Sequence, residues 1–389
     1  MGFTGFTLVM PFLPLYFRQL GVTDVGEIAL WSGLSLGVTP AITALLAPLW
    51  GRLADRFGRK IMVQRSLASF VLVMGAMAYA ADAWHVFALR AIQGLFAGYG
   101  ALTLTMAADL APRDRMGYAI GVVQTAQRLG PALGPIIGGT VAQIVGLRRA
   151  FFVTSGFFLI ALLLVSFMYH ERRPSPAAAA HGTGRVTFRS VLAFENFIVL
   201  MAVIFGLQFV DRSFGPVLPL YLPQLGASPA RVPILSGVLF SIGAGSAAVG
   251  NNLCARLLAR YTARTVIVAS GAVAATGALI YTIATSSAIL FAGTPLFGLA
   301  IGTATTAAYT AAGTIIPASA RGAGFGLLTT ASLAGLALSP ILSGMLGAFS
   351  IRAVFLLDVV ALLMLAAMVR RLMVAAPQRA ASVPAQEEM

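Results

Sequence analysis

Five charged side chains interrupt long apolar stretches of this 389-residue sequence, and three glutamines lie near them in the chain. The set comprises Arg90, Gln93, Gln127, Arg128, Gln208, Asp211, Arg212 and Asp358. A carboxyl group in a low-dielectric site can take up and release a proton near neutral pH, because burial disfavours its charged form. Arginine and glutamine side chains donate hydrogen bonds to polar solutes. Together these residues predict a buried cavity that exchanges protons and binds a small solute.

The two acids are not equivalent candidates for the proton carrier. Asp211 is the first choice, because Gln208 precedes it by one helical turn and could orient it. Asp358 is the second, because it lies nearer the end of its apolar stretch, where it could cap a packing contact with Arg352. The alternative is a permanent ion pair between Asp211 and an arginine of another span, such as Arg90 or Arg128. Three arginines against two acids favour an anionic or zwitterionic solute.

The elements that must position these residues are membrane-spanning helices. The sequence is 59% hydrophobic and 10% charged, whereas soluble domains carry roughly 25% charged residues. A span needs ~20 mainly apolar residues. Charge and turn clusters divide the chain into twelve such stretches, near 2–20, 27–50, 61–81, 85–107, 117–142, 150–169, 196–222, 231–254, 265–285, 287–312, 322–347 and 352–369. The sequence therefore predicts an all-α membrane protein with twelve transmembrane helices.

The basic residues set the expected orientation. With a cytoplasmic N-terminus, 18 of the 26 Lys and Arg residues fall in cytoplasmic connections or the tail, and five fall in outer connections. Cytoplasmic loops carry the excess of positive charge, so both termini are expected in the cytoplasm. The net charge of +14 then reflects topology, and we expect no nucleic acid partner. The Ala-, Gly- and Arg-rich composition suggests a bacterial source. The expected location of the predicted spans is therefore the inner membrane of a bacterium.

An internal repeat divides the chain into two halves. Pro11–Gly21 returns as Pro216–Gly226 at an offset of about 205, and Pro135 returns as Pro340. Parallel repeats of this kind place a solute site near the midplane between the halves. We expect an N-terminal six-helix bundle over 1–169, a cytoplasmic linker over 170–195, a C-terminal bundle over 196–372 and a cytoplasmic tail over 373–389.

A basic motif connects the second and third predicted spans. It reads Gly-Arg-Leu-Ala-Asp-Arg-Phe-Gly-Arg-Lys from Gly51 to Lys60. Gly51 and Gly58 permit a tight reversal, and Asp55 can face a helix N-terminus, where the macrodipole favours an anion. We expect a conformational latch made of Gly51, Asp55, Arg56, Gly58, Arg59, Asp109 and Arg113. An ordinary basic loop is the alternative.

Two further motifs lie inside predicted spans. Arg90, Gln93 and Gly94 share one face of a helix, and an arginine inside a span indicates a functional site; a side chain that reaches the outer interface is the alternative. The fifth span carries a glycine and proline motif formed by Gly130, Pro131, Gly134, Pro135, Gly138 and Gly139. Glycines at four-residue steps allow close helix approach, and a generic packing face is the alternative.

These three motifs resemble those of the major facilitator superfamily: G-x-L-a-D-r-x-G-r-k, R-x-x-q-G and g-x-x-x-G-P-x-x-G-G. The last is typical of its antiporter branches, so the chain is most similar to the twelve-span drug:proton antiporters. The resemblance implies two pseudo-symmetric six-helix bundles that export small molecules, drug-like or metabolite, by alternating access in exchange for protons. The first span lacks the acid that many such exporters carry. A metabolite importer or facilitator of the same fold, and a non-transporting membrane sensor, are the alternatives.

Motifs of other function classes are missing. The sequence contains no G-x-x-x-x-G-K-[ST], H-E-x-x-H or C-x-x-C pattern. It has one cysteine and three histidines. We therefore expect no enzyme, no cofactor and no metal site. The expected partners are a small-molecule substrate, protons and the lipid bilayer, and the protein is expected to be a monomer.

Overall fold

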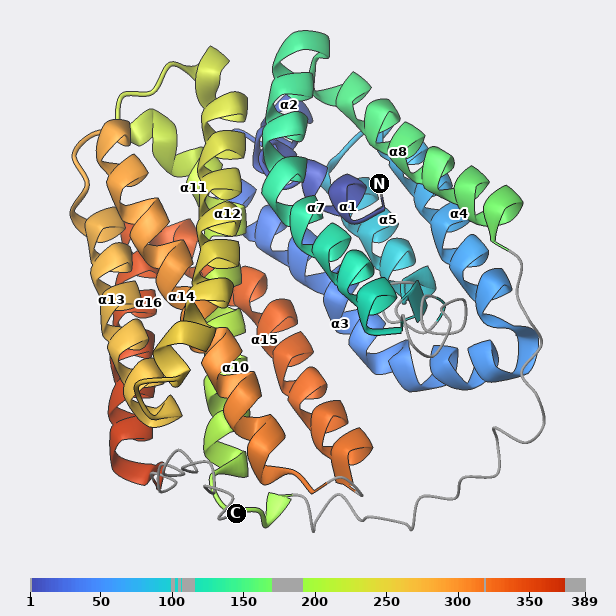
Figure 1. Ribbon diagram of the computed structural model, residues 1–389. Coiled ribbons are helices and arrows are strands. Elements are labelled where there is room, and N and C mark those ends of the chain that lie inside the picture. Colours follow the sequence, from blue (N-terminus) through green and yellow to red (C-terminus); the bar gives the residue numbers. More distant parts are fainter. Residues whose placement is uncertain are drawn as a thin grey trace, which may run out of the picture.

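The computed structural model describes residues 2–98, 102–103, 106, 116–169, 192–317 and 320–374, and the side chains at 3, 48, 51, 55, 116–122, 124, 128, 321 and 322 are not described. Within these ranges the chain is helical and forms two halves side by side (Figure 1). The helices of the first half are α1 (Gly2–Leu8), α2 (Leu13–Gln19), α3 (Val25–Phe57), α4 (Arg59–Met77), α5 (Ala83–Phe96), α7 (Met116–Val145) and α8 (Leu147–Met168).

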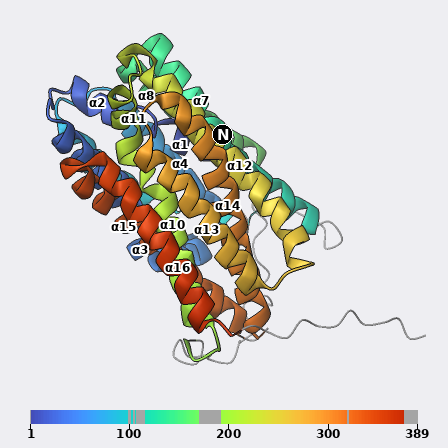
Figure 2. The same ribbon diagram turned by 90° about the vertical axis from the view of Figure 1, so that its left-hand side faces the viewer.

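The second half repeats this order. Its helices are α10 (Phe197–Arg212), α11 (Phe214–Gln224), α12 (Val232–Leu258), α13 (Ala263–Ile283), α14 (Ser287–Ile315), α15 (Arg321–Phe349) and α16 (Ile351–Leu372). The predicted spans correspond to these helices, except that the first consists of α1 and α2 and the seventh of α10 and α11. The fourth is described as the helix α5 only as far as Phe96. Two of these helices, α13 and α16, pack side by side on the flank of the half (Figure 2).

The outer surface is suited to lipid. In the part of the chain that the structure describes, nine helices are long and apolar enough to cross a membrane. Large apolar side chains cover this surface, for example Leu45, Phe167 and Met364. A water-soluble protein would expose few such contiguous side chains. The structure therefore has the form of a multi-pass membrane protein.

One tyrosine in each half makes the same contact. The Tyr16 hydroxyl donates a hydrogen bond to the Met77 carbonyl oxygen at 2.6 Å, and the Tyr221 hydroxyl donates one to the Tyr281 carbonyl oxygen at 2.9 Å. Each bond joins the end of the first span of its half to the third. The repeat that the sequence predicts is therefore present in side-chain contacts.

A pair of arginines shows the same symmetry. Arg148 donates to the carbonyl oxygen of Ala80 at 3.5 Å, and Arg352 donates to that of Ala284 at 3.2 Å. Both arginines begin the last span of their half and bind a carbonyl group after the third span, where a helix leaves such groups unpaired.

The tyrosine bonds lead to a paired prediction. We expect Tyr16→Phe and Tyr221→Phe each to lower the free energy of unfolding by about 1 kcal/mol, because each removes one buried hydrogen bond. Their effects on the melting temperature in detergent should add, because the two sites are far apart. Tyr79→Phe is the control, since Tyr79 is exposed. Equal melting temperatures for all three variants and the parent would contradict the prediction.

The two halves meet through close backbone contacts at one end of the molecule. A Cβ atom at Gly33 of α3 would overlap the carbonyl oxygen of Pro340 in α15, and one at Gly139 of α7 would overlap that of Pro233 in α12. The Ile136 backbone N–H donates to Ser241 Oγ across the same boundary at 3.0 Å. We call this region the closed end. From it the ribbons of α3 and α15 diverge toward the opposite end of the bundle (Figure 1).

The two ends of the second half are joined. Asn196, before α10, donates through Nδ2 to the Val374 carbonyl oxygen at 3.1 Å. Its Oδ1 accepts the Val374 backbone N–H at 2.8 Å. Asn196 has φ 63°, a left-handed conformation that asparagine tolerates better than most residues. The start of α10 and the segment after α16 are therefore held together.

Candidate functional site

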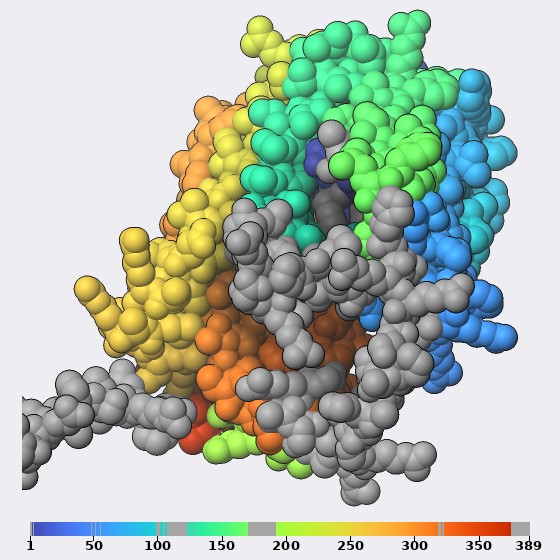
Figure 3. Space-filling view, turned by 45° about the vertical axis from the view of Figure 1, so that its right-hand side comes forward, coloured from blue at the N-terminus to red at the C-terminus, as the bar shows by residue number. Residues whose placement is uncertain are grey.

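A cavity of about 280 Å³ lies between the halves. Its described lining comes mostly from the second half, with α1 and α7 closing it from the first. The lining residues are Thr7, Met10, Gln127, Pro131, Pro135, Asp211, Arg212, Phe214, Leu218, Leu239, Phe240, Gly243, Ala244, Ala247, Ala248, Asn251, Tyr281, Thr294, Phe297 and Gly298. The space-filling view shows that the surface is also hollowed between α7 and α8 (Figure 3).

Small residues on α12 create the space for this cavity. Gly243, Ala244, Ala247 and Ala248 carry little or no side chain toward it. Opposite them are aromatic rings of α11 and α14, of which Phe214 and Phe297 have ring centroids 4.8 Å apart. A mainly apolar wall with a few polar groups is the usual composition of a small-molecule site.

The charged groups of the cavity form one ion pair. Arg212 Nε lies 3.3 Å from Asp211 Oδ2, and about a third of each side chain is exposed. Gln208, which was expected to orient Asp211, instead donates to Ser332 Oγ at 2.8 Å. The expected alternative pairing of Asp211 with Arg90 does not occur. Among the described lining residues, one base therefore balances one acid, and the side chain of Arg128 is not described.

Arg90 and Gln93 lie inside the first half and do not line the cavity. Their side chains are 2% and 0% exposed, respectively, so the alternative of an arginine that reaches the interface is wrong. Arg90 Nη1 donates to Gln93 Oε1 at 3.0 Å, and Thr39 donates to the Arg90 carbonyl oxygen at 2.8 Å. Among the described residues, Arg90 Nε and Nη2 and Gln93 Nε2 have no hydrogen-bond partner. No acid of the described part of the chain pairs with this buried arginine.

Asp358 is also buried away from the cavity. Its exposed fraction is 0%, and Oδ2 lies 2.6 Å from the Ser213 hydroxyl. Oδ1 has no hydrogen-bond partner in the part of the chain that the structure describes. The expected contact with Arg352 is wrong, because Arg352 donates to the Ala284 carbonyl oxygen. Ser213 separates α10 from α11, so Asp358 lies directly behind the two cavity-lining residues that flank this serine.

The predicted latch motif is partly described. Gly58 forms the turn between α3 and α4 with φ 97°, as expected. Gly51 does not contribute to the reversal, because α3 continues through it to Phe57. Arg56 lies over the Phe57 ring at 5.3 Å, and Arg59 is the first residue of α4.

The other latch residues lie outside the described part of the chain. Asp109 and Arg113 are not described, nor is the side chain of Asp55. The latch therefore stays a prediction. The same holds for Arg128, whose side chain is not described.

The glycine motif of α7 contacts helices on both sides. The Gly130 carbonyl oxygen accepts a hydrogen bond from Thr7 Oγ1 at 3.0 Å. A Cβ atom at Gly138 would overlap the backbone of Leu8 in α1, whereas one at Gly139 would overlap α12. Pro131 and Pro135 of the motif line the cavity. This segment therefore packs against the first span and the opposite half while it forms a cavity wall.

The two ends of α5 are capped by side chains that sequence reasoning did not single out. At its start, Asp82 accepts the His85 backbone N–H at 2.9 Å, and this bond lowers the pKa of Asp82. At its end, Trp50 Nε1 donates to the Leu95 carbonyl oxygen at 2.9 Å. The Arg65 guanidinium lies 3.4 Å from the centre of the Trp50 ring, a cation–π contact.

Sequence reasoning also missed several cavity residues. Thr7, Asn251, Tyr281 and Thr294 line it, and the Tyr281 and Thr294 hydroxyls lie 2.5 Å apart. Their only sign in the sequence is a polar side chain in an apolar stretch, which many structural threonines also show.

Comparison with known proteins assigns the chain to a family. A profile described as the Major Facilitator Superfamily matches residues 1–294 and 200–388. The chain belongs to the Major Facilitator Superfamily. This membership agrees with the all-α membrane fold that the sequence predicts.

Curated relatives within the superfamily are multidrug transporters by name. A multi-drug resistance efflux pump PmrA homolog from Lactococcus lactis subsp. lactis (strain IL1403) is 34% identical over 258 residues, or 66% of this chain and 64% of the relative. The multidrug resistance protein MdtG of Citrobacter koseri is 36% identical over 238 residues, or 61% of this chain and 59% of that protein. The aligned part thus spans less than two thirds of either relative.

Solved structures of other facilitators share the fold at low identity. A bacterial homolog of the human lysosomal transporter Spinster, in an inward-facing and occupied conformation, has a TM-score of 0.78 at 16% identity, over 95% of this chain and 93% of that one. A D-xylose-proton symporter has a TM-score of 0.75 at 16% identity, over 96% and 94%. These likenesses concern the fold alone.

Proposed function

We propose that the protein exports small amphiphilic molecules by alternating access, in exchange for protons. The observation that carries the proposal is the cavity between the halves, in which aromatic and small apolar residues lie around the Asp211–Arg212 ion pair. Such a site suits a largely apolar molecule with a few polar groups. The identity of about a third to proteins named multidrug efflux pumps supports export.

The direction of transport depends on the orientation in the membrane. If the arginine-rich end faces the cytoplasm, as its positive charge indicates, the closed end faces outward. The structure then represents a state from which the cavity opens inward to load solute. Export requires that the halves later separate at the closed end and meet at the opposite end. The basic motif from Gly51 to Lys60 would latch that second state.

Proteoliposomes with a defined interior provide the test. With the cytoplasmic side facing out, an interior more acidic than the medium should drive accumulation of the lipophilic dye Hoechst 33342 against its gradient. Collapse of the proton gradient by an ionophore should abolish accumulation. One proton moving down one pH unit supplies about 1.4 kcal/mol, so accumulation of roughly tenfold per pH unit is expected.

The rival function is a proton-driven importer, which the fold of the D-xylose-proton symporter makes reasonable. It predicts accumulation when the proton gradient is reversed. A panel of neutral, cationic and zwitterionic aromatic compounds, with xylose as the sugar control, should separate the two. Transport of no compound under either gradient would overturn the proposed function in favour of a non-transporting sensor.

A further inference from the structure

Ser213 lies between two hydrogen-bond acceptors at the junction of α10 and α11. Its Oγ is 2.6 Å from Asp358 Oδ2 and 2.9 Å from the Val210 carbonyl oxygen. A serine hydroxyl has one hydrogen to donate, and a backbone carbonyl group can only accept. One serine hydrogen cannot serve both contacts at once.

The protonation state of Asp358 decides whether both contacts of Ser213 can be hydrogen bonds. If Asp358 carries a proton, its carboxyl group donates to Ser213 Oγ, and the Ser213 hydroxyl donates to Val210. Both contacts are then hydrogen bonds. If Asp358 is ionised, the serine hydrogen must turn to the carboxylate, and the contact with the Val210 carbonyl group is lost. The observed geometry thus matches the protonated carboxyl group.

The surroundings provide no positive charge for the ionised form. Among the described residues, no basic side chain pairs with Asp358. The titratable groups of the packed elements are engaged elsewhere: Arg212 pairs with Asp211, Tyr221 donates to the Tyr281 carbonyl oxygen, and Arg264 of α13 donates to the Arg370 carbonyl oxygen. In α15 the side chain of Arg321 is not described. Burial of an unpaired carboxylate is strongly unfavourable.

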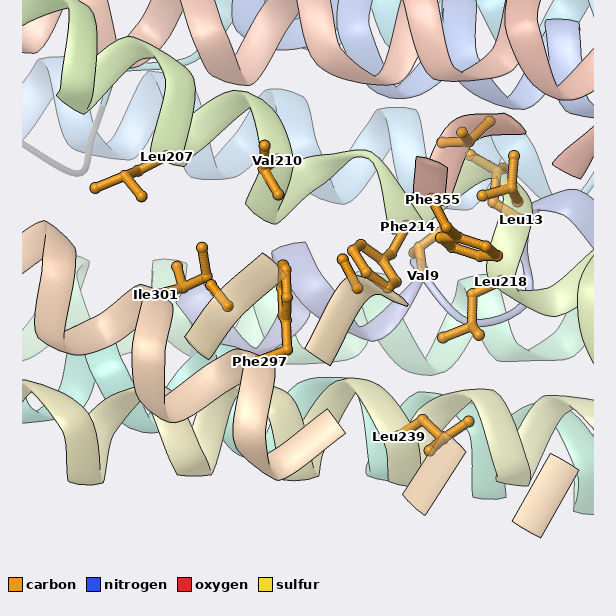
Figure 4. Close-up of a cluster of buried hydrophobic side chains, with 14 of the residues drawn as sticks. Val9, Leu13, Leu207, Val210, Phe214, Leu218, Leu239, Phe297, Ile301 and Phe355 are labelled. Atoms are coloured by element: carbon orange, nitrogen blue, oxygen red, sulfur yellow. The ribbon is translucent and has the colours of Figure 1, made fainter. Parts of the chain in front are cut away.

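Two aromatic rings lie next to this carboxyl group and its serine partner in the chain, and one of them lines the cavity. The Phe214 and Phe355 rings have centroids 5.2 Å apart, and Phe214 lines the cavity. The close-up shows these two rings beside each other, near Leu218 (Figure 4). Phe355 precedes Asp358 by one turn of α16, and Phe214 follows Ser213 in the chain. A movement at the α10–α11 junction would therefore move Phe214 and change access to Asp358.

We propose that Asp358, and not Asp211, is the carboxyl group that exchanges the transported proton, and that Ser213 couples its protonation to the α10–α11 junction. On deprotonation the proton passes to water that enters from the cavity, and the Ser213 hydroxyl turns from Val210 to the carboxylate. The junction then loses a hydrogen bond next to two cavity-lining residues. This inference rests on the proposed proton exchange and assigns its site.

The first test needs no substrate. Infrared spectra of the parent at neutral pH should contain the carbonyl band of a buried protonated carboxylic acid. Asp358→Asn should lack this band, and Asp211→Asn should retain it. In Ser213→Ala the band should shift, because its hydrogen-bond acceptor is gone, whereas Ser213→Thr should keep the parental position. A band that persists in Asp358→Asn would overturn the assignment.

The second test uses the proteoliposomes and Hoechst 33342 described above. Asp358→Asn should lose at least tenfold in proton-driven accumulation while its dye exchange stays within about threefold of the parent. Asp82→Asn is the matched control, because Asp82 is exposed and does not line the cavity, and it should still accumulate dye. Ser213→Ala should shift the pH profile of accumulation, and Ser213→Thr should restore it.

The outcomes separate the two proposals. If the parent accumulates dye and Asp358→Asn does so equally well, only the inference fails. If the parent shows no proton-driven accumulation, the proposed function fails, whereas the infrared result still decides the protonation of Asp358. If Asp358→Asn does not fold, Ser213→Ala and Ser213→Thr decide, and identical band positions and pH profiles in both would overturn the inference.

Discussion

Gly139→Ala is expected to shift the protein away from the observed conformation and to lower transport at least tenfold. The added Cβ atom would overlap the Pro233 carbonyl oxygen at the closed end. Overpacking typically costs about 1–3 kcal/mol, and it would act only on the state in which α7 and α12 touch. Since a shift of about 1.4 kcal/mol changes a population ratio tenfold, single cysteines introduced at closed-end positions should become more accessible to thiol reagents.

Gly156→Ala is the matched control for this experiment. Gly156 lies on α8, and a Cβ atom there would meet nothing within 4 Å. Its transport and accessibility should equal those of the parent. Parental behaviour of both variants would show that the α7–α12 contact does not limit the conformational change.

The second large effect concerns Arg90 and its partner Gln93. For Arg90→Met, stability and transport activity should change in opposite directions. Arg90→Met should raise the melting temperature, because replacing a buried charge with an apolar side chain is often stabilising by about 1–4 kcal/mol. Transport should be lost, because a buried arginine that destabilises the fold is expected to have a role in transport. Gln93→Leu should lower the free energy of unfolding by about 1–3 kcal/mol, because it removes the hydrogen-bond partner that the structure describes for the guanidinium group.

Melting temperatures in detergent and transport per protein would test this pair. Gln93→Glu serves as a further comparison, because it gives Arg90 a negative charge and should stabilise the fold relative to Gln93→Leu. A lower melting temperature for Arg90→Met than for Gln93→Leu would mean that Arg90 is a structural residue.

The helices could be predicted because the physical signal of a span extends over many residues. Apolar length, basic loops and the repeat of Pro11–Gly21 as Pro216–Gly226 were enough to locate them. The break between α1 and α2 was not predicted. Proline is tolerated both in the first turn of a helix and in a loop between helices. Pro11 and Pro14 therefore did not distinguish a continuous span from a broken one.

The site was harder to predict, because side-chain partners depend on neighbours that are distant in the sequence. Asp211 and Gln208 share a helical face, but Ser332 of α15 binds the glutamine, and Arg212 binds the acid. Similarly, the position of Asp358 gave no sign of Ser213, which lies 145 positions earlier in the chain. Identifying buried charged residues was possible from the sequence, whereas assigning their partners required the packed structure.

The hydrogen bonds between Asn196 and Val374 have a consequence for engineering. They hold the residue before α10 next to a residue just after α16, although 178 positions separate the two. A chain whose ends meet can be circularly permuted with a short connection. The second half could therefore be expressed with a new N-terminus in the turn between α12 and α13, and with a few glycines joining Val374 to Asn196. The two bundles could then be produced as separate polypeptides and reassembled.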